Sequence, residues 1–240
     1  MREGSYKGLV VAIVPAAGLG RRFGSGTNKA FQTLDGKPLL VWSLQTLEAV
    51  ADIAEIIPVL KFEEMEKGRM LFEEYGLRKI KTIAAGGKER QDSVYNALKL
   101  IEDRDCVVLI HDGVRPLLEK KLAENAINEL LTSPAGKGID GIILGVPLKD
   151  TIKEAEDAVI TKTLKRGSLW AIQTPQVFPY GKILTAYDRA MKEGFYSTDD
   201  SALLEHCEGK IKVVMGSYRN IKVTTPEDIL IAEALLKNSS

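Results

Sequence analysis

Residues 9–29 read LVVAIVPAAGLGRRFGSGTNK, an apolar run followed by a loop rich in glycine and arginine. The run from Leu9 to Val14 is continuous, largely β-branched and bounded by Gly8 and Pro15, which is typical of a strand buried on both faces of a parallel sheet. In open parallel sheets, ligands bind beyond the carboxyl ends of the strands. The loop that follows this strand is therefore the first place to look for a binding site.

Segments with strand and helix periods alternate along the rest of the chain. The patterns predict strands at 56–60, 79–84, 106–110 and 141–146, and helices at 39–50, 62–75, 94–101 and 123–130. This is the spacing of βαβ units, and it predicts an α/β fold with a doubly wound, mostly parallel sheet. A strand at 169–172, a helix around 184–191, a strand at 211–215 and a helix capped by Thr225 complete one expected domain over residues 1–240.

The segment 149–165 breaks this rhythm, because it is polar and charged and has no apolar helical face. It predicts a protruding two-stranded β-arm at about residues 147–168. The arm has too little apolar surface to pack on its own sheet. We therefore expect it to pair with a second copy of the chain.

The composition limits the classes of function. The 240 residues include 33 basic and 33 acidic side chains, and a formal net charge of zero argues against broad nucleic-acid binding. No apolar run approaches the ~20 residues of a membrane-spanning helix, and the polar N-terminal residues lack the pattern of a signal peptide. Cys106 and Cys207 form no CxxC pair, as expected of reduced thiols in the cytoplasm.

The loop after the first strand combines small residues with three cations, Arg21, Arg22 and Lys29. Small residues let backbone amides approach phosphate oxygens, and the cations would neutralise a polyphosphate. Phe23 breaks the GxGxxG fingerprint of dinucleotide-binding folds, the second strand ends at Lys61 rather than at an acid, and the GxxxxGK[ST] pattern of a P-loop is missing. The alternative to a polyphosphate site is a flexible surface loop whose glycines serve turns.

This loop and a series of later motifs resemble one family along nearly the whole chain. The later motifs are GGKERQDSV at 86–94, HDGVRP at 111–116, Asp150–Thr151, Arg166, Trp170, TPQ at 174–176, Thr198–Asp199 and NIKVT at 220–224. In this order they are similar to the 2-C-methyl-D-erythritol 4-phosphate cytidylyltransferases of non-mevalonate isoprenoid synthesis. The resemblance implies a Rossmann-like nucleotidyltransferase fold and a homodimer held by the arm. The chain departs from the family at Asn28 and Ala30, where proline and glutamine are usual, and at Lys88, where an acid is common.

The resemblance implies transfer of a cytidylyl group from CTP to 2-C-methyl-D-erythritol 4-phosphate, with release of pyrophosphate and with Mg²⁺ as cofactor. Two alternatives stay open: a cytidylyltransferase for another polyol phosphate such as ribitol 5-phosphate, and a non-catalytic nucleotide sensor. The grouping of Arg22, Lys29 and Asp112 argues against a sensor, because binding alone needs no groups for in-line phosphate chemistry. No Ser-His-Asp or Cys-His set indicates covalent catalysis.

The cationic candidates follow from the charge of the reactants. CTP must meet a second anion, so the site needs cations that stabilise the charge developing at the α-phosphorus. The resemblance assigns this catalytic role to Arg22 and Lys29. It assigns Arg166 and Lys222 to catalysis as well, as the residues that hold the polyol phosphate for attack.

Asp112 is the candidate metal ligand. It follows an apolar strand, and a carboxylate at the carboxyl end of a strand faces the cleft where Mg²⁺ would bridge phosphate oxygens. The alternative is that Asp112 caps the next turn or pairs with Arg115. We expect its neighbour His111 to be a packing residue. We expect Asp199 and Asp200 to belong to a helix cap, as acids in the first turn, rather than to a metal pair.

The remaining candidates bind the nucleotide or the polyol. The resemblance assigns nucleotide binding to Ala16, Ala17, Gly18, Gly20, Gly86, Gly87 and Ser93. The alternative for Ser93 is a helix cap, and the resemblance favours contact with the base. Arg90 and Asp92 are expected to orient their loop. Substrate binding is assigned to Thr151, Arg166, Thr174 and Lys222, and the alternative for the basic residues is a solvated surface position.

Overall fold

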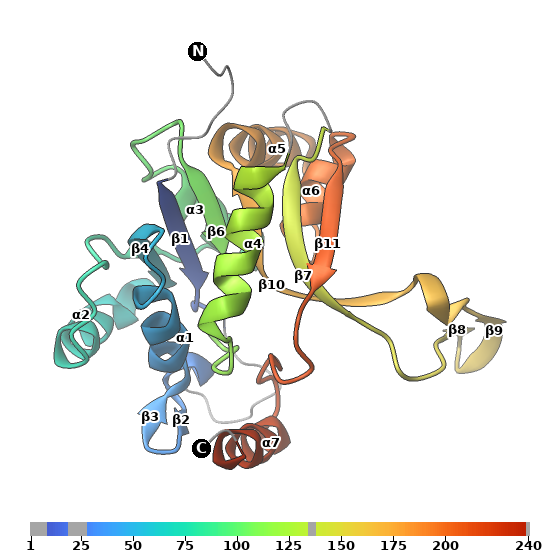
Figure 1. The fold of residues 1–240 in the computed structure, drawn as a ribbon, viewed down its shortest axis with the longest axis horizontal. Helices are drawn as coiled ribbons and strands as arrows, with labels where there is room; N and C mark the ends of the chain where they lie inside the picture. Colours follow the sequence, from blue (N-terminus) through green and yellow to red (C-terminus); the bar gives the residue numbers. More distant parts are fainter. Residues whose placement is uncertain (1–8, 19–27, 134–137, 239–240) are drawn as a thin grey trace.

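The computed structural model describes residues 9–18, 28–133 and 138–238. Within them a seven-stranded sheet runs in the order β11 (Ile211–Met215), β7 (Gly141–Pro147), β10 (Trp170–Pro179), β6 (Val107–Ile110), β1 (Val10–Pro15), β4 (Ile53–Leu60) and β5 (Ala84–Ala85) (Figure 1). Every neighbouring pair is parallel except the two that include β10, which is antiparallel to both β6 and β7. The prediction of a doubly wound, mostly parallel sheet is confirmed.

Helices cover both faces of this sheet. One face packs on α1 (Leu39–Glu48), α2 (Met65–Glu74) and α4 (Lys120–Thr132), and the other on α3 (Arg90–Leu98), α5 (Tyr180–Glu193) and α6 (Ser201–His206). Strand β1 shows why its sequence is apolar throughout: Val10, Ala12 and Val14 face the first set of helices, and Val11 and Ile13 face the second. Alternate side chains of one strand point to opposite faces, so a strand covered on both sides has no polar position.

The sequence patterns misjudged the edges of the sheet. The strand predicted at 79–84 is wrong in extent, because only Ala84–Ala85 pair with β4 and Ile80 makes an isolated bridge to Ile56. This segment lies at an edge, where one side of the backbone has no partner strand and alternating lysines meet solvent. A short hairpin of β2 (Thr33–Leu34) and β3 (Lys37–Pro38) was missed, although its Asp-Gly turn is a known hairpin signal.

The predicted two-stranded arm is present. Strands β8 (Lys153–Glu156) and β9 (Val159–Thr163) pair antiparallel and project from the ends of β7 and β10, away from the sheet (Figure 1). Every residue of both strands is exposed, and among them Val159 and Ile160 are 67% and 56% exposed. Within one chain the arm therefore buries almost none of its apolar surface.

The last helix, α7 (Pro226–Lys237), begins as its sequence predicts. Thr225 is the N-cap, Pro226 follows it, and the Asp228 side chain completes a capping box. The helix packs its buried Ala232 against Leu34, Leu39 and Val223. None of the helices in the described part of the chain is long and apolar enough to cross a bilayer.

Candidate active site

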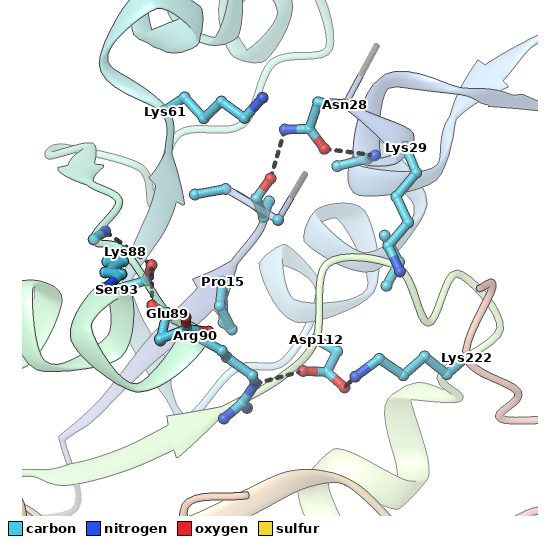
Figure 2. A pocket seen from close by; sticks show the side chains of 16 residues that line it. Pro15, Asn28, Lys29, Lys61, Lys88, Glu89, Arg90, Ser93, Asp112 and Lys222 are labelled. Atoms are coloured by element: carbon cyan, nitrogen blue, oxygen red, sulfur yellow. Dashed lines mark hydrogen bonds and ion pairs between the residues drawn. The ribbon is translucent and has the colours of Figure 1, made fainter. Parts of the chain in front are cut away.

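A cleft of about 660 Å³ opens at the carboxyl ends of β1, β4 and β6 (Figure 2). Its described lining residues come from the loops after these strands, from the start of α3 and from the segment before α7: Pro15, Ala16, Ala17, Gly18, Asn28, Lys29, Ala30, Lys61, Gly87, Lys88, Glu89, Arg90, Ser93, Asp112, Val114 and Lys222. The cleft thus lies where an open parallel sheet is expected to bind its ligand.

The charged side chains of this cleft are mainly cationic. Its described walls carry the cations Lys29, Lys61, Lys88, Arg90 and Lys222, against the carboxylates of Glu89 and Asp112. The chain has no formal net charge, yet the described surface of this cleft is positively charged. The low-dielectric walls of a cleft strengthen the attraction of such a surface for a polyanion.

Small residues let the loop after β1 and the loop before α3 pack closely beside the cleft. A Cβ atom at Gly86 would lie 2.4 Å from the Cβ of Ala17, and a Cβ atom at Gly87 would lie 2.3 Å from the Cβ of Asp92. Both distances are too short for real atoms, so only glycine permits this approach. Ala16, Ala17, Gly18 and Gly87 line the cleft, and Gly86 packs against Ala17 beside it. Their contact with a nucleotide stays a prediction.

Ser93 lies in the cleft wall and is not the cap of α3. The cap is Glu89, which forms a capping box with Asp92. The Ser93 hydroxyl donates to the carbonyl of Glu89 at 3.0 Å and accepts the backbone N–H of Gly87 at 3.0 Å. A serine oxygen has two acceptor sites, so one stays available to a donor on a bound base. Contact of Ser93 with the base stays a prediction.

Lys29 enters the cleft from a single turn of 3₁₀-helix, Lys29–Phe31, whose first residue is fixed by Asn28. The Asn28 side chain donates to the carbonyl of Ala16 at 2.7 Å and to the Glu64 carboxylate at 2.7 Å, and it accepts the N–H of Ala30 at 3.1 Å. Asn28, one of the residues that depart from the family motif, thus joins the Lys29 turn to the end of β1 and to the segment after β4.

Asp112 is buried among cations. Its Oδ1 lies 3.1 Å from Nε of Arg90, and its Oδ2 lies 2.9 Å from Nζ of Lys222 (Figure 2). The same Oδ2 lies 3.5 Å from Nε of Arg115. Burial opposes ionisation, but the three cations together hold the pKa of Asp112 well below its usual range. The carboxylate is therefore ionised, and the pairing with Arg115 considered as an alternative is part of its environment.

His111 is a buried packing residue, as expected. Its Nδ1 lies 3.0 Å from the Thr174 hydroxyl and its Nε2 lies 3.3 Å from the Arg115 carbonyl. Thr174 accepts the N–H of Asp112 at 3.0 Å, so its hydroxyl proton is free to be donated to Nδ1. Burial lowers the pKa of His111 to about 4, which leaves the ring neutral near neutral pH.

A second cavity of about 450 Å³ adjoins the cleft. Thr174 lines it, and Arg90, Asp112 and Lys222 line both cavities. Thr174 is 5% exposed and engaged in the His111 network. Thr174 and Lys222 therefore line the same cavity, although the two residues are far apart in the sequence.

The prediction for Asp199 and Asp200 is corrected. Helix α6 begins at Ser201, so both acids precede it rather than occupy its first turn. Asp199 accepts the N–H of Ala202 at 3.2 Å, which is a capping contact. Asp200 turns inward instead and forms an ion pair with Arg90, because its fully buried carboxylate needs a cationic partner. The described residues include no group of three or more acid, histidine or cysteine side chains able to hold a metal.

Two predicted substrate residues lie apart from the cleft. Thr151 and Arg166 flank the arm and line neither cavity, and Arg166 donates to the carbonyl of Lys149 at the base of the arm. The candidates Gly20 and Arg22 lie outside the described residues.

Sequence reasoning missed two features of the site. Lys61 directly follows β4 and lines the cleft, and the strand-end rule that selected Asp112 could have selected it too. No local sequence pattern indicates the contact of Arg90 with Asp200, because the two residues are 110 positions apart.

Comparison with known proteins agrees with this geometry. The family model for 2-C-methyl-D-erythritol 4-phosphate cytidylyltransferase matches residues 10–238. A protein of that name from Geotalea uraniireducens is 44% identical over 232 residues, which cover 95% of this chain and 97% of that protein. Another from Bacillus velezensis is 41% identical over 231 residues, covering 96% of this chain and 97% of that protein.

A solved structure extends the similarity to three dimensions. The crystal structure of 4-diphosphocytidyl-2C-methyl-D-erythritol synthase from Anaerococcus prevotii matches with a TM-score of 0.83 at 33% identity, over 97% of this chain and 98% of that one. The cation-lined cleft at the strand ends, the ordered motifs and these matches along nearly the full length lead to one assignment. The chain belongs to the 2-C-methyl-D-erythritol 4-phosphate cytidylyltransferase family.

Proposed function

We propose that this protein transfers the cytidylyl group of CTP to 2-C-methyl-D-erythritol 4-phosphate, giving the CDP-alcohol and pyrophosphate for isoprenoid precursor synthesis. The observation that carries the proposal is the cleft in which Lys29, Lys222 and Asp112 meet beside the Ala16–Gly18 backbone. A polyanionic nucleotide and an anionic acceptor both find compensating charge there. The family names of the relatives supply the identity of the two substrates.

The reaction is an in-line displacement at phosphorus. An oxygen of the polyol phosphate attacks the α-phosphorus of CTP, the bond from that phosphorus to the bridging oxygen of the β-phosphate breaks, and pyrophosphate leaves with the electron pair. A phosphate monoester is largely dianionic at pH 7, so the nucleophile needs no strong general base. The protein acts by positioning and by fixed charge, with Lys29 and Arg22 proposed to stabilise the transition state and Lys222 to hold the acceptor phosphate.

Mg²⁺ is the proposed cofactor, and the donor groups fit an ion that the nucleotide brings with it. Asp112 offers carboxylate oxygens at the cleft, but both already face cations. Mg²⁺ commonly takes one or two carboxylates together with substrate phosphates and water. Asp112 is the described residue that would contact the ion, which when bound would neutralise phosphate charge.

A substrate panel tests the proposal. Purified protein is incubated with CTP, Mg²⁺ and one polyol phosphate at a time, and pyrophosphate release and the nucleotide product are measured. We expect the fastest turnover with 2-C-methyl-D-erythritol 4-phosphate and none with CTP alone. Faster turnover with ribitol 5-phosphate would replace the substrate and keep the reaction class. CTP binding without release of its pyrophosphate in the presence of any acceptor would indicate a sensor.

We further propose that the arm joins two copies of the chain and that each arm completes the site of the other copy. Thr151 and Arg166 lie outside both cavities of their own chain, although the family motif assigns them to the substrate. The exposed Val159 and Ile160 provide apolar surface for pairing with a second arm.

We also propose that the protein resides in the cytoplasm, a reducing compartment. The two cysteines are free thiols, and Cys106 is buried. Burial raises the pKa of Cys106 to about 12, which makes it an unreactive core residue.

A further inference from the structure

A series of alternating charges runs from the interior beside α5 and α6 to the cleft. Arg90, the first residue of α3, donates from its two terminal guanidinium nitrogens to Asp200 at 2.9 and 2.8 Å. The Asp200 side chain is fully buried, and Tyr187 of α5 donates its hydroxyl to the same carboxylate. Such a bidentate pair fixes the orientation of the planar guanidinium as well as its position.

The third nitrogen of the guanidinium points toward the cleft. Nε of Arg90 donates to Oδ1 of Asp112 at 3.1 Å, and Oδ2 of Asp112 lies 2.9 Å from Nζ of Lys222 (Figure 2). These three residues are also the ones that line both cavities. The charge series therefore forms the boundary at which the two cavities meet.

Lys222 gains a defined position from this arrangement. It lies in the segment between β11 and α7, and its side chain is 37% exposed. A lysine ammonium sits on a flexible four-carbon stem, so a partially exposed one samples many positions unless an anion restrains it. Asp112 supplies that anion, and Arg90 restrains Asp112 from the opposite side.

We propose that Arg90 and Asp200 are positioning residues that act through Asp112 to hold the ammonium of Lys222 where the two cavities meet. The inference rests on the proposed function, because Lys222 is there assigned to the phosphate of the polyol substrate. It goes beyond the expectation that Arg90 orients its own loop, since the anchor is a buried carboxylate on a different element.

The competing explanation is a structural one. The Arg90–Asp200 pair also joins the start of α3 to the start of α6, and loss of one partner of a buried ion pair destabilises a fold. A structural pair would reduce stability and the amount of folded protein. It would not change the KM for one substrate selectively.

The test is a double-mutant cycle with conservative substitutions. Arg90→Lys keeps the charge and loses the bidentate fork, and Asp200→Asn keeps the shape and loses the charge. Each is measured alone and combined with Lys222→Met, with separate KM values for CTP and for 2-C-methyl-D-erythritol 4-phosphate. The control is Arg189→Lys, which alters an ion pair with Glu193 on the exposed surface of α5.

We expect Arg90→Lys and Asp200→Asn each to raise the KM for the polyol phosphate about tenfold and to leave the KM for CTP within about twofold. In the Lys222→Met background the same changes should add less than about twofold, because residues that act through one another are not additive. Arg189→Lys should change neither KM. Additive losses, or equal rises in both KM values, would overturn the proposal.

A second readout separates this proposal from the proposed function. In a crystal structure of substrate-free Arg90→Lys, Nζ of Lys222 should have left Oδ2 of Asp112. An unchanged contact would overturn the positioning role whatever the kinetics show. If the wild-type protein turns over no polyol phosphate, the proposed function fails, and the position of Lys222 in this variant still decides whether Arg90 holds it.

Discussion

Asn28 shows how one side chain substitutes for a backbone restraint. The backbone of Asn28 has φ −63°, which is the value that a proline ring imposes. The usual proline of the family therefore fits the same backbone, and this chain reaches it by hydrogen bonds from the Asn28 amide to Ala16 and Glu64. In this chain these hydrogen bonds hold the turn from which Lys29 enters the cleft.

The first prediction at the scale of single residues concerns Lys29. Lys29→Ala removes a charge that matters most as the transition state forms, so we expect kcat to fall ~100-fold or more. Steady-state kinetics with CTP and the polyol phosphate measure it. Because Lys29 is only half-buried, the thermal unfolding midpoint should change little. Lys121→Ala, at an exposed position of α4, is the control. A higher KM for CTP with normal kcat would reduce Lys29 to a binding residue.

The second residue prediction concerns Asn28 itself. Asn28→Ala deletes two donors and a cap, and we expect it to cost about 1–2 kcal/mol of stability and to lower kcat by loosening Lys29. Asn28→Pro restores the backbone restraint, so this variant should lose less stability and less kcat than Asn28→Ala. Urea unfolding and kcat are compared for the two variants. Equal kcat losses would show that the Lys29 turn does not depend on the backbone angle.

At the scale of elements, the contact between the loop after β1 and the loop before α3 depends on glycine. Gly86→Ala would place a methyl group 2.4 Å from the Cβ of Ala17 and would push the two loops apart. We expect the Kd for CTP to rise by about tenfold or more, because backbone groups that cradle phosphates must be held in place. Isothermal titration calorimetry measures the change.

Gly181→Ala is the matched control for this prediction. Gly181 lies in the first turn of α5, and a Cβ atom there would meet nothing within 4 Å. Alanine has a higher helix propensity than glycine, so this variant should keep its CTP affinity and gain up to ~1 kcal/mol of stability. A similar loss of affinity in both variants would mean that the tight contact at Gly86 is not the cause.

The cap of α7 gives a pH-dependent prediction at the same scale. Burial opposes ionisation of Asp228, but hydrogen bonds from Thr224 and Thr225 hold its pKa below the usual range. The unfolded state thus binds its proton more tightly, so the carboxylate stabilises the fold fully above about pH 4 and loses that effect as the pH falls further.

Asp228→Asn should therefore lower stability by about 1 kcal/mol at pH 7 and by less at pH 3. Thermal unfolding of both proteins is compared across this range, and the difference cancels the contributions of the other carboxylates. A difference between the two proteins that stays constant from pH 7 to pH 3 would contradict the assignment of the cap to the charged form.

At the scale of the whole molecule, the arm leads to a prediction about two copies. If Arg166 serves the partner's site and Lys29 its own, homodimers of Lys29→Ala and of Arg166→Ala should each be nearly inactive. When the two proteins exchange subunits, a mixed dimer carries both lesions in one site and none in the other. Random pairing makes about half the dimers mixed, so activity should recover to about a quarter of wild type.

The same mixing experiment also tests the alternative that each site is built from one chain. If Arg166 served the site of its own chain, every site in every dimer would carry one lesion and no activity would return. Native mass spectrometry of differently tagged subunits confirms the exchange independently. A monomeric protein at assay concentration would also reject the arm as a dimer contact, whose exposed Val159 and Ile160 would then need another explanation.

The sequence by itself determined the class of the fold and most of the cleft. Helices cover both faces of strand β1, so every position of the strand needs an apolar residue. Its continuous apolar sequence therefore already indicated a doubly wound sheet. The motif order carried the family, and the strand-end rule led to Asp112. The polar segment at 149–165 predicted the arm because a segment without an apolar face cannot join a core. Each of these signals can be read along the chain, from periodicity, from residues close together or from the order of short motifs.

Only the tertiary structure decided which charges meet. Asp112 contacts Arg90 and Lys222, and Arg90 contacts Asp200, although these residues come from four separate segments of the chain. The direction of β10 and the short extent of β5 were likewise decided by the neighbouring strands. Ion pairs and strand pairings between distant segments leave no periodic trace, because either partner alone is compatible with a solvated position. Packing the helices on the two faces of the sheet is what brings the partners within reach and makes their pairing necessary.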